Sequence, residues 1–394
     1  MNFENKTLAE LFQRLDDVTR ERITATIERI VAVKKQNGKI VVATGSGPNI
    51  HEGATTLIAE LIRLGVIDGV ITSSAVIAHE MAGTLDRVKR LHAALLGMNQ
   101  TKMPRGNIFE ITLLNDDYLA SLAGEMVLDM DLYRRAAAAE GKVIIKAAGN
   151  MAYPMGLRSE RLALEIEAVA KTRGLPFEVV AGQGADPLTM IGAGARKGVP
   201  VLVSVTQLVG GGMVGLAVGD SISLKRRSTL IAAMLGEADL IIESGVALTQ
   251  EIHDGPFETY TGHGIWSDWD GYRTYSLQDK TLVRIDLDQN LESVWQMERS
   301  DSKIQEAINQ GLPKTKCTGV PFRMEMSGFA RLEGSIPLIA DLGVVWPLLA
   351  ERVTRELGLP LQFRSYPQHT EEGRLMRDWI VENIKPVQKS LLLT

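Results

Sequence analysis

The sequence predicts an α/β protein in which a Rossmann-like, mostly parallel sheet has helices on both faces. Short apolar runs alternate, almost to the end of the chain, with longer segments in which Leu and Ala recur every three or four residues. The first long apolar run ends in a glycine-rich turn and precedes an amphipathic segment, which is the order of a β-α-β unit. Parallel strands joined by right-handed crossovers follow from this order.

The predicted strands are apolar runs, several of them β-branched and bounded by Gly or Pro. They span Lys39 to Thr44, Gly69 to Thr72, Asn107 to Leu113, Lys142 to Lys146, Phe177 to Val180, Val199 to Val205, Leu240 to Glu243, Leu282 to Leu287 and Pro360 to Ser365. The predicted helices span Ala54 to Leu64, Asp116 to Ala139, Ser159 to Arg173, Ser221 to Gly236 and Ile336 to Leu357.

Composition limits the class of protein. A chain of 394 residues with 45% hydrophobic residues buries a sizeable core in one α/β body or two domains. Its net charge of −5 lacks the basic footprint that binds nucleic acid, so we expect no such partner. The single cysteine, Cys317, excludes an internal disulfide and fits the reducing cytoplasm. No window holds ~18 uninterrupted apolar residues and no signal peptide opens the chain, so we expect a soluble protein without a membrane partner.

The turn after the first predicted strand has the features of a phosphate site. Gly45, Gly47 and Gly53 add no Cβ bulk, so backbone N–H groups can approach a phosphate near the positive end of the following helix. The usual dinucleotide fingerprint has its third glycine three residues after the second, but Ile50 stands there. The turn therefore predicts a nucleotide site from an incomplete motif.

Small hydroxyl residues follow the second predicted strand. Because the carboxyl ends of parallel strands form the ligand crevice, residues 44–49 and 72–75 are expected to line one wall together. His79 and Glu80 then project from the next helix. The alternative interpretation is that Ser73 and Ser74 cap that helix.

Histidines, carboxylates and tryptophans are densest between residues 251 and 271. In a loop near the crevice, His263 can transfer a proton and Asp268 can hold an ammonium group. The alternative is a surface loop whose tryptophans pack its own interior. His253 and Asp254 are too loosely spaced from these two residues to favour a metal site, and we expect none.

Further segments have both a functional and a structural interpretation. The glycines of residues 208–215 either let the backbone close over a ligand or form an ordinary β-α connection. Asp186 is either catalytic or a helix cap. The run Lys225-Arg226-Arg227 is most simply a solvated helix face, with an anion contact as the alternative.

The order of these motifs resembles the NAD-binding domain of the ornithine cyclodeaminase-like LOR/SDH family and, more distantly, the deoxyhypusine synthase family. The resemblance is based on Gly45 to Ala54, Leu61 to Val70, the turn Ala78-His79-Glu80, Gly198 to Ser204, Val218 to Ser221, and Ala238 to Ile242. It covers mainly residues 40–255. Deoxyhypusine synthases carry a reactive lysine after a tryptophan-containing segment, and residues 262–271 offer none, which argues against a spermidine-dependent protein transferase.

The resemblance implies a deoxyhypusine synthase-like sheet that holds NAD tightly, in a homo-oligomer, dimer or tetramer, with sites near subunit interfaces. Matched by position, the cofactor-binding residues are Gly45, Ser46, Gly47, Pro48, Asn49, Ser73, Ser74, Ala75 and Ser221. Glu80 and Asp220 are matched by position as catalytic residues. The chemistry of the residues adds His263 or His79 as the general acid/base, and Asp268, with Glu80, to orient the ammonium group. Residues 1–290 would form the NAD-binding and catalytic body, and residues 291–394 an α/β extension or interface lobe.

We therefore expect an enzyme that uses bound NAD as a transient hydride acceptor on a small amine or amino acid, with a cyclodeaminase-like lyase as the nearest reaction. The alternatives are an aminoalkyl transferase that acts on a polyamine, a dehydrogenase that releases NAD(P) at each turnover, and a noncatalytic nucleotide-binding protein.

Overall fold

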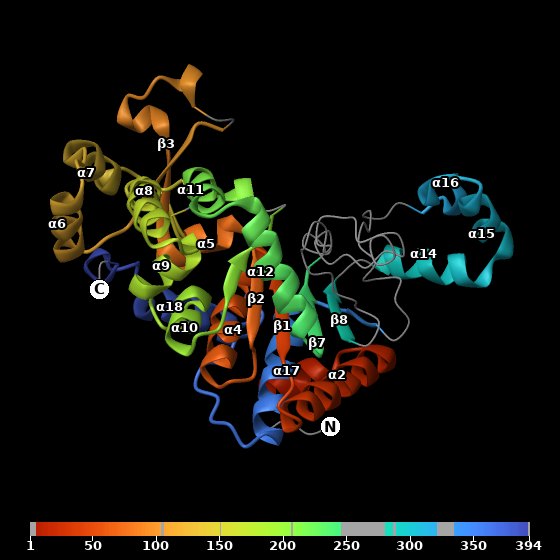
Figure 1. Cartoon of the computed structure of the whole chain (residues 1–394). Coiled ribbons are helices and arrows are strands. Elements are labelled where there is room, and N and C mark those ends of the chain that lie inside the picture. Colours follow the sequence, from red (N-terminus) through yellow and green to blue (C-terminus); the bar gives the residue numbers. More distant parts are fainter. Residues whose placement is uncertain are drawn as a thin grey trace.

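The computed structural model describes residues 5–103, 106–149, 151–205, 208–245, 280–286, 289–320 and 335–392. The predicted fold class is confirmed: a six-stranded parallel sheet has helices on both faces (Figure 1). Its strand order is β6-β2-β1-β7-β8-β9. The strands are β1 Ile40–Thr44, β2 Gly69–Thr72, β6 Val201–Val203, β7 Leu240–Ser244, β8 Thr281–Asp286 and β9 Ile336–Ile339.

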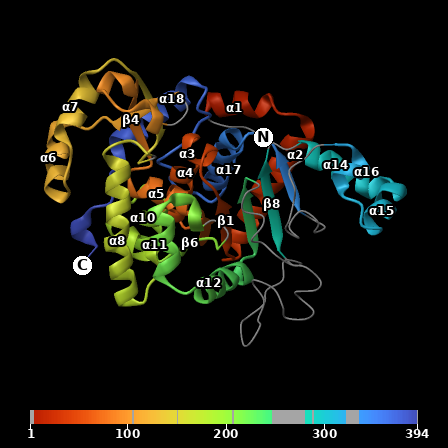
Figure 2. The same ribbon diagram turned by 90° about the horizontal axis from the view of Figure 1, so that it is seen from above.

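The helices fall into two layers and an arm. One face of the sheet packs on α12 (Leu224–Glu237), because Val41 and Ala43 share a core with Ile231 and Leu235. The alternate residues Ile40 and Val42 lie in the larger core on the other face, with helices α2, α4 and α17. Those helices and others are α1 Lys6–Gln13, α2 Asp17–Lys35, α3 Pro48–His51, α4 Ala54–Arg63, α5 Ser74–Met81, α8 Met155–Arg173, α9 Phe177–Gly184, α10 Met190–Lys197, α11 Met213–Ser221, α17 Leu342–Glu356 and α18 Glu371–Asn383. Helices α14 Gln289–Ser300, α15 Ser302–Asn309 and α16 Lys314–Thr318 extend away from the sheet (Figure 2).

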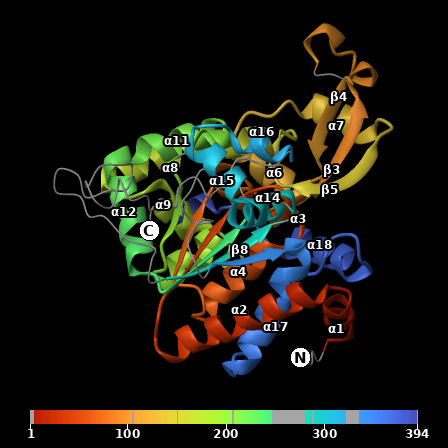
Figure 3. The same ribbon diagram turned by 90° about the vertical axis from the view of Figure 1, so that its right-hand side faces the viewer.

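A second sheet is antiparallel and has the order β4-β3-β5. Its strands and flanking helices are β3 Leu85–His92, β4 Ile108–Thr112, β5 Lys142–Ala147, α6 Asp116–Glu125 and α7 Met130–Ala138. Figure 3 shows it at the opposite end of the molecule from α1, α2 and α17. Two of its strands were predicted, but for the parallel sheet. β3 was missed because charged residues such as Asp86 and Arg87 interrupt its apolar pattern.

Four helix and strand predictions were wrong. Residues 177–180 form the start of helix α9 instead of the predicted strand, and Pro176 is the N-cap of that helix. Residues 360–365 form no strand. The single helix predicted over residues 116–139 is broken after Glu125, and Asp129 caps α7. The long helix predicted from Ile336 is an edge strand, β9, followed by α17.

The C-terminal part of the chain is built into both sheets. β9 pairs with β8, so a boundary at residue 290 passes through the main sheet. α17 packs on α2 and α4, and α18 packs on β3. Among the described helices, none has the length and apolarity needed to cross a membrane.

Candidate functional site

The main sheet has a switch point between β1 and β7. From β1 the chain proceeds outward on one side through β2 and β6, and on the other side lie β7, β8 and β9. Thr44 and Ser244 are register partners at the carboxyl ends of the two central strands. Open parallel sheets bind ligands in the crevice at such a point. The glycine turn after β1 lies there, opposite Gly245 after β7.

The turn presents free backbone to this crevice. Gly47 has φ +65° and ψ −117°, a conformation that essentially only glycine adopts. A Cβ added at Gly45 or Gly47 would meet no atom within 4 Å, so the space beside the turn is open. Within the described residues, the amide N–H groups of Ser46 and Gly47 have no hydrogen-bond acceptor. Successive unpaired amides of this kind form an anion-binding concavity.

The helix after the turn differs from the expected one. Pro48 opens the four-residue helix α3, and the amphipathic helix α4 begins only at Ala54. Gly53 has φ +69°, and a Cβ there would lie 2.7 Å from Sδ of Met376. The third glycine of the motif therefore permits close packing, and the amides of the turn are the groups with no acceptor that are free to meet an anion.

Asn49 fastens the turn to β7. Its Nδ2 donates to the carbonyl of Ser244 at 3.3 Å, and its Oδ1 accepts from the Ser244 hydroxyl at 2.7 Å. The same hydroxyl accepts from the indole N–H of Trp346 at 2.9 Å. Asn49 is buried, so its side chain, which was predicted to contact the cofactor, positions the turn.

Ser73 caps α5, as the structural interpretation proposed, whereas Ser74 bonds to another segment instead of capping this helix. Ser73 Oγ accepts from the amide of Val76, and Ser74 Oγ accepts from the amide of Gly211 at 2.9 Å. A Cβ at Gly211 would lie 2.8 Å from the carbonyl oxygen of Ser74. The glycine-rich segment therefore packs on the start of α5 next to Ala75. A cofactor contact of Ser73, Ser74 or Ala75 stays a prediction.

Two histidines and an arginine lie beside the turn. His79 Nδ1 lies 2.8 Å from the carbonyl oxygen of Ala148, so in the neutral ring Nδ1 carries the proton and Nε2 has a lone pair. Burial lowers the pKa of His79. The ring is therefore neutral at pH 7, which suits a general base.

His51 is held in the opposite tautomer. Its Nδ1 lies 3.4 Å from Nη2 of Arg377, a cation that donates, so the neutral ring carries its proton on Nε2. Burial, and then the positive charges of Arg377, His79 and Lys146, lower the pKa of His51.

Arg377 belongs to α18 and completes this cluster. Its Nη2 also donates to the carbonyl oxygen of Ile145, and its buried Nε has no partner among the described residues. Burial lowers the pKa of this guanidinium. Sequence reasoning missed Arg377 because no motif surrounds it, whereas His51 lies inside the glycine-turn motif and was given no role.

The carboxylate of Glu80 contacts the backbone of a neighbouring helix, whereas a contact with substrate was predicted. Its carboxylate oxygens accept from the amides of Met190 and Ile191 at 2.8 and 3.0 Å, which caps α10. The side chain is buried, and burial raises its pKa to about 7. Both oxygens already bind the helix, so its predicted contact with an ammonium group is replaced by a capping role.

Asp220 and Ser221 lie away from the crevice. Asp220 is exposed and forms an ion pair with Lys171, which lowers the pKa of the aspartate. Ser221 Oγ accepts from the amide of Phe177 at 3.1 Å, at the start of α9. Both residues lie at the C-terminal end of α11, whereas Gly211 lies just before its N-terminal end. The length of the helix, about 12 Å, therefore separates them from Gly211. Their predicted contacts with cofactor and substrate are therefore not supported by their positions.

Two pairs of buried charges lie in or against the main sheet, where the sequence predicted none. Arg227 was expected on a solvated face, but it is fully buried in an ion pair with Glu178, and Glu178 also accepts from the amide of Val203 at 2.7 Å. Glu243 and Arg284 are register partners on β7 and β8, buried 4.0 Å apart. An apolar run in a sequence does not reveal such pairs.

His263 and Asp268 lie outside the described residues, so the structure gives no position for either. In the described part of the chain, no group of three or more His, Cys, Asp or Glu side chains is arranged to hold a metal ion. The described candidate site therefore consists of the glycine turn and the cluster His51, His79 and Arg377.

No family model and no curated protein matches the chain. Similar solved structures include ArgZ, an arginine dihydrolase from the ornithine-ammonia cycle in cyanobacteria, with 13% identity and a TM-score of 0.38 over 87% of this chain and 32% of that one. A putative LOR/SDH protein from Methanococcus maripaludis S2 has 12% identity and a TM-score of 0.37 over 91% and 72% of the two chains. AgrE in ternary complex with ornithine and NAD+ has 13% identity and a TM-score of 0.39 over 87% and 34%.

The chain spans about a third of the length of ArgZ and of AgrE. At these identities and TM-scores the similarity establishes neither the activity nor the ligand of this chain.

Proposed function

We propose that the crevice at the β1–β7 switch point binds NAD, with its pyrophosphate on the amides of Ser46 and Gly47. The observation that carries this proposal is the position of these two free amides, at the carboxyl ends of the central strands and beside open space. Gly45 and Gly47 leave room that a Cβ would fill, which fits the close approach of a phosphate. NAD supplies a hydride acceptor when it is bound.

The substrate proposed for this site is a small amino acid or amine. This class comes from the resemblance to the LOR/SDH family, and the cluster beside the turn suits it. The Arg377 guanidinium can bind a carboxylate, and the lone pair on His79 Nε2 can accept a proton. Oxidation of an amine carbon releases a hydride to NAD and a proton from nitrogen, and His79 accepts that proton. His51 orients Arg377 through its Nδ1.

The reaction proposed is a deaminating or cyclising lyase that retains NAD. Oxidation would give an imine whose electrophilic carbon a second amine of the substrate, or water, could attack, so that ammonia would leave from the adduct before the hydride returns. A homo-oligomer, dimer or tetramer, and a cytoplasmic location stay predictions.

Mass spectrometry of the small molecules released by denaturing the purified protein tests the proposal. We expect NAD in stoichiometric amount. If no nucleotide is released but NAD binds on titration and NADH accumulates with substrate, the protein is a dehydrogenase that releases its cofactor. If NAD fails to bind at all, the proposed site is wrong.

A further inference from the structure

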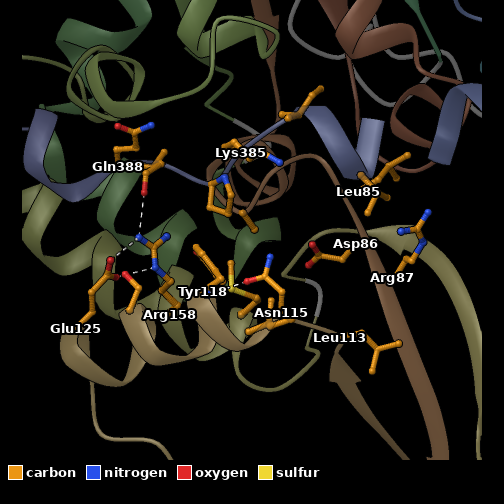
Figure 4. Close-up of a pocket in the computed structure, with 18 of the residues that line it drawn as sticks. Leu85, Asp86, Arg87, Leu113, Asn115, Tyr118, Glu125, Arg158, Lys385 and Gln388 are labelled. Carbon is orange, nitrogen blue, oxygen red and sulfur yellow. Dashed lines mark hydrogen bonds and ion pairs between the residues drawn. The ribbon is translucent and has the colours of Figure 1, made fainter. Parts of the chain in front are cut away.

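A cavity of about 800 Å³ lies between the small sheet, α6, α8 and residues 384–390 (Figure 4). This volume is within the range of small-molecule sites. Ala82 lines it just after α5 ends, three residues from His79. Neither the glycine turn nor the cluster His51, His79 and Arg377 is among the residues that line the cavity.

Most charged groups in the wall already have a partner of opposite sign. Arg158 donates from Nε to Glu125 at 2.8 Å and from Nη2 to the carbonyl of Val387 at 3.0 Å. Arg87 pairs with carboxylates of α18, and Lys389 pairs with Glu165. Lys385 donates to the backbone of α18. The cations of the wall are thus held by the protein.

Asp86 differs from these groups. Its Oδ2 accepts from the amide of Gly149 at 3.0 Å, and no cation pairs with it among the described residues. Burial raises its pKa to about 7, because no positive charge offsets the cost of desolvating the carboxylate. Asp86 is half-buried in the cavity wall, so its carboxylate can pair with a cation that enters the cavity.

Tyr118 supplies a second unsatisfied group. Its hydroxyl is buried and has no hydrogen-bond partner in the described part of the chain. Figure 4 shows Tyr118 beside Asn115, and Asp86 is also among the residues that line the cavity. About half of the remaining lining residues are apolar, and the aliphatic part of the wall includes Leu85, Leu113, Leu114, Ile384, Pro386 and Val387.

We propose that this cavity binds a small aliphatic primary amine, with the ammonium group between Asp86 and the Tyr118 hydroxyl and the alkyl chain on the aliphatic wall. An ammonium group has three N–H donors, so it satisfies the carboxylate and the phenol oxygen together. The site is distinct from the proposed NAD crevice and does not depend on it.

A ligand-observed NMR titration of the full chain with n-butylamine tests the site, with n-butanol as the uncharged ligand of matched shape. At about pH 8 the Asp86 carboxylate is ionised and the amine is protonated. We expect saturable binding of the amine and at least about tenfold weaker binding of the alcohol, because only the amine pairs with the carboxylate.

Three variants locate the binding. Asp86→Asn keeps an acceptor for Gly149 but removes the charge, so amine affinity should fall at least about tenfold. Tyr118→Phe removes a hydroxyl that has no partner in the free protein, so the fold should keep its stability while amine affinity falls several-fold. Asp131→Asn removes an exposed aspartate on α7 and should bind the amine like the wild type. Equal binding of amine and alcohol, no amine binding, or unchanged affinity in both Asp86→Asn and Tyr118→Phe contradicts the proposal.

Discussion

Ser244 and Asn49 exchange two hydrogen bonds across the switch point, and the Ser244 hydroxyl also accepts from Trp346. The pair connects the end of β7 to the first turn after β1, although 195 residues separate the two side chains. The position of the glycine turn is thus set by a buried polar contact as well as by the sheet.

Asn49→Ala should therefore loosen the turn. It removes one partner of a buried pair, which costs about 1–3 kcal/mol of unfolding free energy, measured by urea denaturation. NAD affinity should fall as well, because the turn is no longer held. The control is Asn383→Ala, whose exposed amide bonds only to its own helix. Equal stability of the two variants speaks against the role of Asn49.

Alanine at the two glycines of the turn should have different effects. Gly47→Ala forces a Cβ into a conformation with φ +65°, so we expect a loss of about 1–2 kcal/mol in unfolding free energy. Gly45 has no positive φ and open space around it, so Gly45→Ala should fold normally. Its methyl group would occupy the phosphate approach, and NAD affinity should drop about tenfold or more by fluorescence titration. Normal NAD affinity of Gly45→Ala would place the phosphate elsewhere.

His79→Gln should remove the general base. We expect turnover to fall by about 10²–10⁴-fold with NAD still bound, because proton transfer by a positioned side chain contributes that much. His92→Gln, an exposed histidine on β3, is the control. The pKa of His79 is lowered, so the wild-type rate should hold through neutral pH and decline only below the ordinary histidine range. A rate that declines above pH 7 on acidification would indicate another base.

The buried carboxyl groups predict how stability depends on pH. Burial raises the pKa of Glu80 from 4.5 to about 7, so the folded state binds a proton more tightly than the unfolded state. Its contribution is fully present below pH 4.5 and is lost as pH rises through 7, by on the order of 3 kcal/mol. Glu80→Gln should flatten urea-denaturation stability over this window. If the unfolding free energy of Glu80→Gln depends on pH as it does in the wild type, then other groups cause that dependence.

The two ion pairs at α11 and α12 should differ sharply. Glu178→Gln leaves the Arg227 charge buried without its anion, which costs about 3–5 kcal/mol of unfolding free energy. Asp220→Asn breaks an exposed pair with Lys171 and should change neither stability nor turnover measurably. Turnover that falls in Asp220→Asn with unchanged stability would restore the catalytic role predicted from the sequence.

The sequence predicted five of the six strands of the main sheet, because these buried parallel strands are continuous apolar runs, but it placed β9 in a helix. The predictions failed for segments whose pattern of polar and apolar residues does not match the structure they adopt. β3 alternates charged and apolar residues, so it has no apolar run, and residues 177–180 look like a strand but lie after a proline that starts a helix. Periodicity cannot assign a strand to one of two sheets, so β4 and β5 were placed in the wrong one.

The candidate site was predictable only in its local part. The glycine turn and His79 stand in a recognisable order, whereas Arg377 reaches His51 through tertiary contacts from α18. Glu80 is the opposite case, a residue whose sequence context suggests a functional role that its contacts do not support. A carboxylate beside a histidine looks functional in sequence, but only the packing of α5 on α10 reveals that its oxygens cap a helix.

Arg377 stands 326 positions after His51, so the ribosome finishes the glycine turn long before it makes the arginine that borders it. During synthesis the first β-α-β unit can form while α18 is still absent, since domains generally fold from the N-terminus as they emerge. The edge of the sheet then stays uncovered until the later helices have been synthesised. A nascent chain therefore carries the turn without the positive charge beside His51 until α18 has been synthesised.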